Sequence, residues 1–366
     1  MDLKYLNAIN ILVSAKIGVL QKIADAFDGN FERAWHSKSL KRFLPREASG
    51  NILLFDGAHK SVPTPPRTDI DPDKEWEKLA REQIEIITIR DKAYPKPLKH
   101  IADPPFLLYV KGDKKVLKND CFAVVGTRNL TEYGKRAVSL IVEPLAQAGL
   151  TIVSGLAMGI DGLAHRAAVK MNAPTIAVLG GGLNDSSVVM ENRKLAKEIL
   201  EKNGAIITEY PLSTSGSKFS FPTRNRIISG LSKGVLVIEA DEKSGSLITA
   251  KSALDQNRDV FAVPGSIFSS KSKGPNQLIA AGAKTVCQAD DILTEYGIDS
   301  SVRQLALIPA NKLEGDIIKI IGRNSLGLDE IIRTISKPAP EVISCLMNME
   351  LENKIINLGN NKFALS

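Results

Sequence analysis

The chain has 366 residues, of which 43% are hydrophobic and 24% charged, so its composition is that of a globular protein with two or three domains and excludes a mostly disordered chain. Its 48 lysines and arginines exceed its 41 acidic residues and give a net charge of +7, which permits nucleic acid or another polyanion as a partner without requiring one. No apolar run approaches the ~18 residues that a membrane helix needs.

The cysteines point to a reducing compartment. Cys121, Cys287 and Cys345 are far apart in the sequence and show no Cys-x-x-Cys spacing, and the amino terminus from Met1 to Lys4 lacks the cationic start and apolar core of a signal peptide. The simplest expectation is a cytoplasmic protein.

Residues 1–60 are expected to form a small helical domain. Leu20, Ile23, Ala24 and Phe27 recur at helical spacing. Gly18 lies in a turn similar to that of helix-hairpin-helix modules, which bind phosphates through backbone N–H groups, although a plain packing turn explains it better.

Residues 61–119 are expected to be a linker and an extension that packs on the core. Pro63, Pro65 and Pro66 indicate an extended crossing. Asp71 can then cap a helix that begins with Pro72, because the fixed φ of proline suits the first helical position.

Residues 120–297 show the pattern of an α/β domain. Short Val- and Ile-rich runs alternate with amphipathic stretches: Phe122 to Gly126, Thr151 to Gly155, Thr175 to Gly180, Ala205 to Glu209, Gly234 to Ala240 and Asp259 to Gly265. Continuous apolar strands separated by helices predict a parallel sheet covered on both faces, in a Rossmann-like, doubly wound fold. Its ligand crevice is expected at the carboxyl ends of the strands.

Four turns of the phosphate-binding type follow these strands. They are Gly126-Thr127-Arg128, Ser154 to Asp161 with Gly155 and Gly159, Gly180 to Gly182, and Ser244-Gly245-Ser246, where hydroxyls open a helix. One glycine turn means little, because tight α/β connections use glycine anyway. Four turns at one sheet edge predict a groove lined with backbone N–H groups and helix N-termini that takes phosphates.

The segment Lys218-Phe219-Ser220-Phe221-Pro222-Thr223-Arg224-Asn225-Arg226 combines three cations with two aromatic rings. Cations pair with phosphates, and phenyl faces stack on unpaired bases, a combination that suits single-stranded nucleic acid. Residues 210–275 contain nine cations and five acids, so more than half of the net charge lies there. The alternative is a loop whose phenylalanines fill the core. The glycine turns nearby favour the binding interpretation.

Other polar residues are expected to be structural. His165 lies four residues after Asp161 and can hydrogen-bond to it, and no second metal ligand is near, so neither a metal nor another cofactor is expected. Glu209 and Glu239 end strands, where either could act as an acid or base. Positioning one of the arginines is the preferred role.

Residues 298–312 are expected to be a linker, and residues 313–366 a winged-helix-like domain. The predicted elements are helices over Leu313 to Ile321, Leu328 to Ile335 and Pro340 to Leu351, and strands over Lys354 to Leu358 and Lys362 to Leu365. This module has six cations and seven acids, which favours contact with protein, or a regulatory role, over reading DNA.

An ordered set of motifs over residues 90–290 resembles the family of DNA-processing proteins called DprA or Smf. The motifs are Tyr94-Pro95 to Leu98, Asp103-Pro104-Pro105, Val125-Gly126-Thr127-Arg128, Ser154-Gly155 to His165, Phe221-Pro222-Thr223-Arg224-Asn225-Arg226, Ser244-Gly245-Ser246-Leu247-Ile248-Thr249-Ala250, Val263-Pro264-Gly265 and Leu278-Ile279 to Gly282-Ala283. The resemblance implies a non-enzymatic bacterial protein that binds incoming single-stranded DNA, protects it and loads the RecA recombinase during natural transformation. It also implies a homodimer, with a SAM-like helical domain before the Rossmann-like core.

The family's DNA-contacting residues correspond here to Arg128, Lys218, Phe221 and Arg224. With the phosphate-type turns, the complete set of expected DNA-binding residues is Arg128, Ser154, Gly155, Gly159, Lys218, Phe221, Arg224, Asn225, Arg226, Ser244, Gly245 and Ser246. One departure concerns the segment Asp185 to Met190, where family members usually carry a Tyr-Pro pair. The contacts contributed by that loop are therefore in doubt.

Two other classes of function stay open on the sequence alone. Rossmann-like nucleotide phosphoribohydrolases have similar glycine-rich loops with a catalytic glutamate at the start of the helix, but residues 244–254 contain no carboxylate. Nucleotide binding without hydrolysis is compatible with the motifs. A winged-helix transcription regulator is disfavoured by the acidic carboxyl-terminal module.

Overall fold

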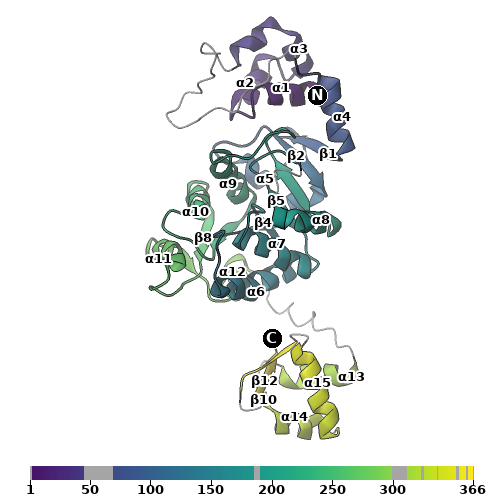
Figure 1. The fold of residues 1–366 in the computed structure, drawn as a ribbon, viewed down its shortest axis with the longest axis vertical. Helices are drawn as coiled ribbons and strands as arrows, with labels where there is room; N and C mark the ends of the chain where they lie inside the picture. The colour runs from purple at the N-terminus through teal and green to yellow at the C-terminus, as the bar shows by residue number, and fades with distance from the viewer. Residues whose placement is uncertain are drawn as a thin grey trace. The chain divides into compact units, whose positions relative to one another are not determined.

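The computed structural model describes residues 2–44, 69–184, 190–298, 311–322, 325–335, 337–351, 354–359 and 362–365. Within these ranges the chain forms two compact units, Met1–Ile298 and Asp299–Ser366 (Figure 1). The prolines Pro63, Pro65 and Pro66, most of the segment from Asp185 to Met190 and most of the expected linker over 298–312 lie outside the described residues. No helix in the described ranges is long and apolar enough to span a bilayer.

A nine-stranded sheet forms the centre of the first unit, in the order β1-β2-β6-β5-β4-β3-β7-β8-β9. The strands are β1 (Ile84–Thr88), β2 (Leu107–Gly112), β3 (Cys121–Val125), β4 (Thr151–Ser154), β5 (Thr175–Val178), β6 (Ala205–Thr208), β7 (Gly234–Val237), β8 (Asp259–Ala262) and β9 (Lys284–Thr285). Strands β3 to β9 pair in parallel, whereas β2 pairs antiparallel with β6 and β1 antiparallel with β2.

The helices of this unit alternate with the strands. They are α1 (Leu3–Leu12), α2 (Val19–Ala26), α3 (Phe31–His36), α4 (Pro72–Arg81), α5 (Lys96–Lys99), α6 (Glu132–Gln147), α7 (Ile160–Lys170), α8 (Arg193–Glu201), α9 (Ser220–Leu231), α10 (Gly245–Asp255), α11 (Lys273–Ala280) and α12 (Asp290–Leu293). Short 3-10 turns are η1 (Lys38–Arg42), η3 (Lys114–Lys118), η5 (Met190–Asn192), η6 (Ser270–Ser272) and η7 (Thr294–Tyr296).

Each face of the sheet has its own core, because successive side chains of a strand point to opposite faces. In β3, Phe122 and Val124 pack with residues of α6, α7 and α12. Ala123 and Val125 pack on the other face with residues of α9 and α10. Helices therefore cover both faces, and the predicted Rossmann-like, doubly wound fold is confirmed.

The strand order reverses beside β3. From β3 the chain adds β4, β5 and β6 on one side, and it then returns to place β7 and β8 on the other. At such a reversal the connecting loops diverge, so the carboxyl ends of β3 and β7 border a crevice. The site described below lies there.

Two expectations about elements were incomplete. Strands β1 and β2 extend the sheet from within the segment expected to be a linker and extension, and β1 has the burial pattern of an edge strand, with Glu85 exposed between buried isoleucines. The cationic aromatic segment is largely helical rather than a loop, because α9 begins at Ser220 and contains Pro222 in its first turn, where a backbone N–H is not needed. The predicted cap of α4 by Asp71 is confirmed.

The helices near the amino terminus share a core with the sheet. Leu6 and Ile9 of α1 belong to the same buried cluster as Leu107 and Tyr109 of β2. Asn10 also donates hydrogen bonds to the Tyr109 hydroxyl at 3.1 Å and to the Glu209 carbonyl at 3.2 Å. A SAM-like character of these helices stays a prediction.

The second unit has the winged-helix order that the sequence predicted. It contains α13 (Lys312–Ile321), β10 (Leu326–Gly327), α14 (Leu328–Ile335), α15 (Ala339–Leu351), β11 (Ile355–Asn357) and β12 (Lys362–Leu365), with the strands in the order β10-β12-β11. Its core contains Ile317, Ile331, Val342 and Phe363.

Candidate nucleic-acid interface

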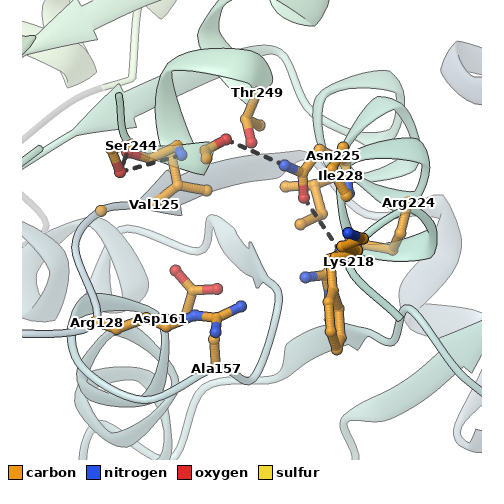
Figure 2. A pocket seen from close by; sticks show the side chains of 15 residues that line it. Val125, Arg128, Ala157, Asp161, Lys218, Arg224, Asn225, Ile228, Ser244 and Thr249 are labelled. Carbon is orange, nitrogen blue, oxygen red and sulfur yellow. Dashed lines mark hydrogen bonds between the residues drawn. The ribbon is translucent and has the colours of Figure 1, made fainter. Parts of the chain in front are cut away.

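A cavity of about 450 Å³ lies at the reversal in strand order (Figure 2). Its walls come from the carboxyl end of β3, the β4–α7 loop, the start of α9 and the start of α10. Eight of the twelve expected DNA-binding residues line it: Arg128, Lys218, Phe221, Arg224, Asn225, Ser244, Gly245 and Ser246. Ser154, Gly155, Gly159 and Arg226 do not line it.

Arg128 and Lys218 are the exposed cations of the cavity wall. The Arg128 guanidinium lies over the Phe221 ring, 5.6 Å from its centroid, and the Lys218 ammonium lies 5.2 Å from the centroid of Phe219. Phe221 is half-buried, with its ring against Gly180 and Gly216. The cavity is therefore lined by two exposed cations and by an aromatic ring that is only partly buried.

Arg224 is buried rather than exposed to solvent. Its Nη1 donates to the carbonyl of Gly155 at 3.0 Å and to that of Val178, and its Nε donates to Asn225 Oδ1 at 3.2 Å. Burial lowers the pKa of Arg224 to about 10, and the nearby Asp161 opposes that change, so the guanidinium stays charged at neutral pH. Arg224 thus joins α9 to the ends of β4 and β5 and gives the cavity floor a fixed positive charge.

The expected role of the β4–α7 turn is corrected by the structure. The Gly155 N–H donates to Asp161 Oδ2 at 3.1 Å, and the buried Ser154 hydroxyl donates to the Val124 carbonyl at 2.6 Å, so these donors are already used within the protein. A Cβ on Gly159 would lie 2.3 Å from the Thr127 carbonyl oxygen, and its φ is +79°. Glycine here permits close contact between two loops, not the approach of a ligand.

The start of α10 faces the cavity as predicted. The Ser244 side chain caps the helix by accepting from the Ser246 N–H, and the two hydroxyls lie 2.8 Å apart. Asn225 Nδ2 donates to the Gly245 carbonyl at 3.2 Å, which joins α9 to α10 across the cavity (Figure 2). A helix N-terminus carries partial positive charge and suits an anion.

Arg226 points away from this cavity. Its Nη2 lies 2.6 Å from Glu209 Oε2, and both side chains are largely buried. Burial raises the pKa of Glu209, and the Arg226 charge opposes that rise. The preferred interpretation of Glu209 as a partner of an arginine is therefore confirmed, whereas Glu239 instead accepts from the N–H and hydroxyl of Thr131.

The expected Asp161–His165 hydrogen bond was wrong. The Thr175 hydroxyl donates to the Ile152 carbonyl at 2.6 Å, so it accepts from His165 Nδ1 at 2.7 Å. Burial, together with the Arg224 charge, lowers the pKa of His165 to about 3, and the imidazole is neutral at physiological pH. Burial raises the pKa of Asp161, while Arg224 and the Gly155 N–H oppose that rise.

Two features of the site were not found from the sequence. The contact between Arg128 and Phe221 joins residues 93 positions apart. The hydrogen bonds from Arg224 to the carbonyls of Gly155 and Val178 span 69 and 46 positions.

No group of three metal-ligating side chains occurs in the described part of the chain.

Comparisons with known proteins agree over most of the chain. Residues 85–297 match the family of DNA recombination-mediator protein A, and residues 302–361 match the DprA winged helix domain. The chain is 39% identical to Protein Smf of Escherichia coli over 297 residues, which cover 78% of each protein.

Solved structures show the same similarity. DNA processing protein A from Streptococcus pneumoniae superposes with a TM-score of 0.62 at 33% identity, covering 79% of this chain and 97% of that one. DNA processing protein A from Helicobacter pylori, whose structure concerns its single-stranded DNA binding mode, gives a TM-score of 0.52 at 31% identity and covers 58% of this chain and 95% of that one.

Proposed function

Because this chain belongs to the DNA recombination-mediator protein A family, we propose that it binds single-stranded DNA, with little sequence preference, in the cavity at the carboxyl ends of β3, β4 and β7. The observation that carries the proposal is that two exposed cations, Arg128 and Lys218, line the same cavity as the half-buried Phe221 ring, over which the Arg128 guanidinium lies. The single-stranded DNA binding of the Helicobacter pylori relative supports it.

Each wall of the cavity has its own part in binding. Arg128 binds a phosphate through two parallel N–H···O hydrogen bonds, and the Lys218 ammonium attracts phosphate as a point charge. The N-terminus of α10, with Ser244 and Gly245, faces a second phosphate. An unpaired base stacks on Phe221, and every base offers such a face, so sequence preference is small. A duplex buries these faces and binds less well.

The buried residues shape the site rather than touch DNA. Arg224 fixes α9 against β4 and β5, and Asn225 holds α9 to α10. Ser154, Gly155 and Gly159 set the distance between the loops after β3 and β4. Arg226 acts through Glu209 and not through a phosphate.

The proposed role includes no chemical step. Asp161, the carboxylate on the cavity wall, is 8% exposed and accepts from the Gly155 N–H, and the buried His165 is neutral. A bound strand is instead shielded and delivered to the RecA recombinase during natural transformation, by a homodimer. The three cysteines are free thiols, which fits the reducing cytoplasm where RecA acts.

Direct binding measurements test this function. The purified protein is incubated with a fluorescent single strand, the matching duplex and AMP, and anisotropy and base release are followed together. Tight binding of the single strand, at least tenfold weaker binding of the duplex and no released base are expected. Equal affinity for duplex and single strand would overturn the proposal, and release of adenine from AMP would identify a phosphoribohydrolase instead.

A further inference from the structure

Glu239 occupies the N-terminal end of helix α6. The residue follows β7 and is 1% exposed. Its Oε2 accepts from the Thr131 N–H at 2.9 Å, and its Oε1 accepts from the Thr131 hydroxyl at 2.5 Å. Thr131 is the N-cap of α6, and a helix N-terminus attracts an anion. The Glu239 carboxylate therefore takes the place that the sequence predicted for a phosphate at the turn after β3.

The space at this helix end is closed as well. A Cβ on the buried Gly134 would lie 2.2 Å from Glu239 Oε2. A phosphate group is much larger than one carbon atom, so it does not fit between the first turn of α6 and the carboxylate. The Gly134 N–H is already used, because it donates to Thr131 Oγ1 at 3.3 Å. The phosphates of a bound strand therefore meet other groups of the cavity, namely its exposed cations and the start of α10.

The same residue fixes the backbone on both sides of Arg128. The Thr127 N–H donates to the Glu239 carbonyl at 2.7 Å, and Thr131 is bonded to the Glu239 carboxylate. Arg128 lies between these two anchors and is exposed, with its guanidinium 5.6 Å from the centroid of the Phe221 ring. The backbone of this loop is therefore held while the arginine side chain stays accessible.

We propose that Glu239 is a positioning residue for Arg128: it acts as an internal anion that occupies the N-terminus of α6 and holds the loop of Arg128 in its binding position. A loop that is fixed before the ligand arrives loses less conformational freedom on binding. Glu239 thereby raises the affinity for a DNA phosphate that it never contacts. The effect on DNA binding rests on the proposed function, whereas the effect on the loop can be measured without DNA.

A double-mutant cycle tests the effect on DNA binding. Glu239→Gln keeps the size of the side chain but leaves one oxygen for two Thr131 donors, so single-strand binding should weaken about fivefold, in line with the cost of ordering one long side chain. The change should have no further effect in an Arg128→Ala protein and its full effect in a Lys218→Ala protein. The matched control is Glu132→Gln, at an exposed position beside Thr131, which should retain its affinity.

Limited proteolysis tests the loop without DNA. Trypsin cleaves after Arg128 only when the surrounding loop opens, so cleavage there should become about fivefold faster in Glu239→Gln, since a lost hydrogen bond makes local opening easier. Cleavage after the exposed Lys118 should stay unchanged. Mass spectrometry assigns the cleavage sites. Thr131→Val, which removes the hydroxyl donor, should have the same effect as Glu239→Gln, and Thr131→Ser, which keeps that donor, should not.

The outcomes separate this inference from the proposed function. The positioning role is overturned if Glu239→Gln, in a folded protein, leaves the affinity unchanged or costs as much in the Arg128→Ala protein as in the original one. It is also overturned if neither Glu239→Gln nor Thr131→Val accelerates cleavage after Arg128. If Glu239→Gln does not fold, the same cycle with Thr131→Val decides. If the original protein binds no single strand while cleavage accelerates as expected, the DNA-binding function fails and the fixing of the loop by Glu239 stands.

Discussion

At the scale of single residues, the two exposed cations of the cavity differ from the buried one. Arg128 and Lys218 are exposed and can meet a phosphate, whereas Nη1 and Nε of Arg224 are bonded to carbonyls and to Asn225. A cation that contacts a phosphate releases counterions from the DNA, whereas a cation that is bonded only within the protein does not. Salt dependence therefore separates the two roles.

We expect Arg128→Ala and Lys218→Ala each to flatten the log–log salt dependence of single-strand binding by about 0.7. Arg128→Lys should keep the slope but weaken binding, because an ammonium cannot form two parallel hydrogen bonds. The matched control is Lys118→Ala, an exposed lysine next to the amino end of β3, at the opposite edge of the sheet. Anisotropy titrations at four salt concentrations give the slopes, and equal slopes in all variants contradict the assignment.

Phe221 is expected to contribute by stacking. Base stacking on an aromatic ring contributes about 1 to 3 kcal/mol, so Phe221→Ala should weaken single-strand binding about tenfold or more, and Phe221→Trp should retain most of it. The effect persists at high salt, since stacking releases no counterions. Phe268→Ala is the control, because Phe268 is 93% exposed and does not line the cavity. Normal DNA binding by a Phe221→Ala variant that melts early would instead assign the ring to the core.

His165 is expected to make the protein sensitive to acid. Its pKa of about 3 in the folded chain lies below the unfolded value of about 6.5, so the unfolded state takes up a proton first as the pH falls. The free energy of unfolding that depends on neutral His165 is fully present above about pH 6.5. It falls by about 1.4 kcal/mol per pH unit as the pH decreases toward 3. His165→Asn keeps a donor near Thr175 and should show a flatter pH dependence of urea unfolding between pH 6 and 4. Parallel curves for the two proteins would exclude this role.

At the scale of elements, α9 is held from both sides. Arg224 fixes it to β4 and β5, and Arg226 fixes it to Glu209 after β6. Phe221 and Asn225 on the same helix line the proposed DNA site. The position of the binding surface thus depends on contacts that never meet the ligand.

Removing one partner of the buried pair should be costly. Arg226→Ala leaves the Glu209 carboxylate buried without its cation, and we expect a loss of about 3 to 5 kcal/mol in unfolding free energy. The double change Arg226→Leu with Glu209→Leu should recover most of that loss. Lys233→Ala, which breaks an exposed pair with Asp120, should cost at most about 1 kcal/mol. Urea denaturation gives all three values, and an equal cost for the two single changes contradicts the prediction.

The elements also show what the sequence could predict. Strands β3 to β8 were predictable because each is a short apolar run, and the winged-helix elements because their apolar periodicity is strong. The start of α9 was not, since phenylalanine, proline and cations together are typical of a loop. Pro222 is tolerated there because the first turn of a helix needs no backbone donor.

The candidate site was predictable in its location but not in its internal contacts. Carboxyl ends of parallel strands meet at one edge, and the turns after β3 and before α10 do line the cavity through Gly126 and Gly245. The glycines of the turns after β4 and β5 do not line it. The sequence could not show that Arg224 turns inward, because its partners are carbonyls of distant strands. Nor could it show that Gly159 accommodates a neighbouring loop.

At the scale of the whole molecule, the two units have separate cores. Helix α15 occupies the position of the recognition helix in helix-turn-helix proteins, yet its sequence contains no lysine or arginine. It exposes Glu341, Met347 and Glu350 instead. Such a surface has little attraction for phosphates.

Deletion of residues 299–366 is therefore expected to change single-strand affinity by less than about twofold, since the proposed phosphate contacts belong to the first unit. The shortened chain should keep its unfolding transition, because Ile298 still packs on the core of the first unit. Anisotropy and differential scanning calorimetry measure the two quantities. A tenfold loss of affinity in a folded truncation would assign DNA contacts to the winged-helix unit.

The reversal of strand order also bears on the order of events during folding. Ala123 of β3 pairs with Val235 of β7, and the loop that carries Arg128 is fixed through Thr131 by Glu239, which follows β7. Contacts between residues so far apart in the chain form slowly, because a long loop must close before any of them is made. A nascent chain that has completed only the strands up to β6 has most of the sheet but lacks α9 and α10, which line the proposed DNA site. Binding of single-stranded DNA should therefore recover last on refolding, after β7 has paired with β3.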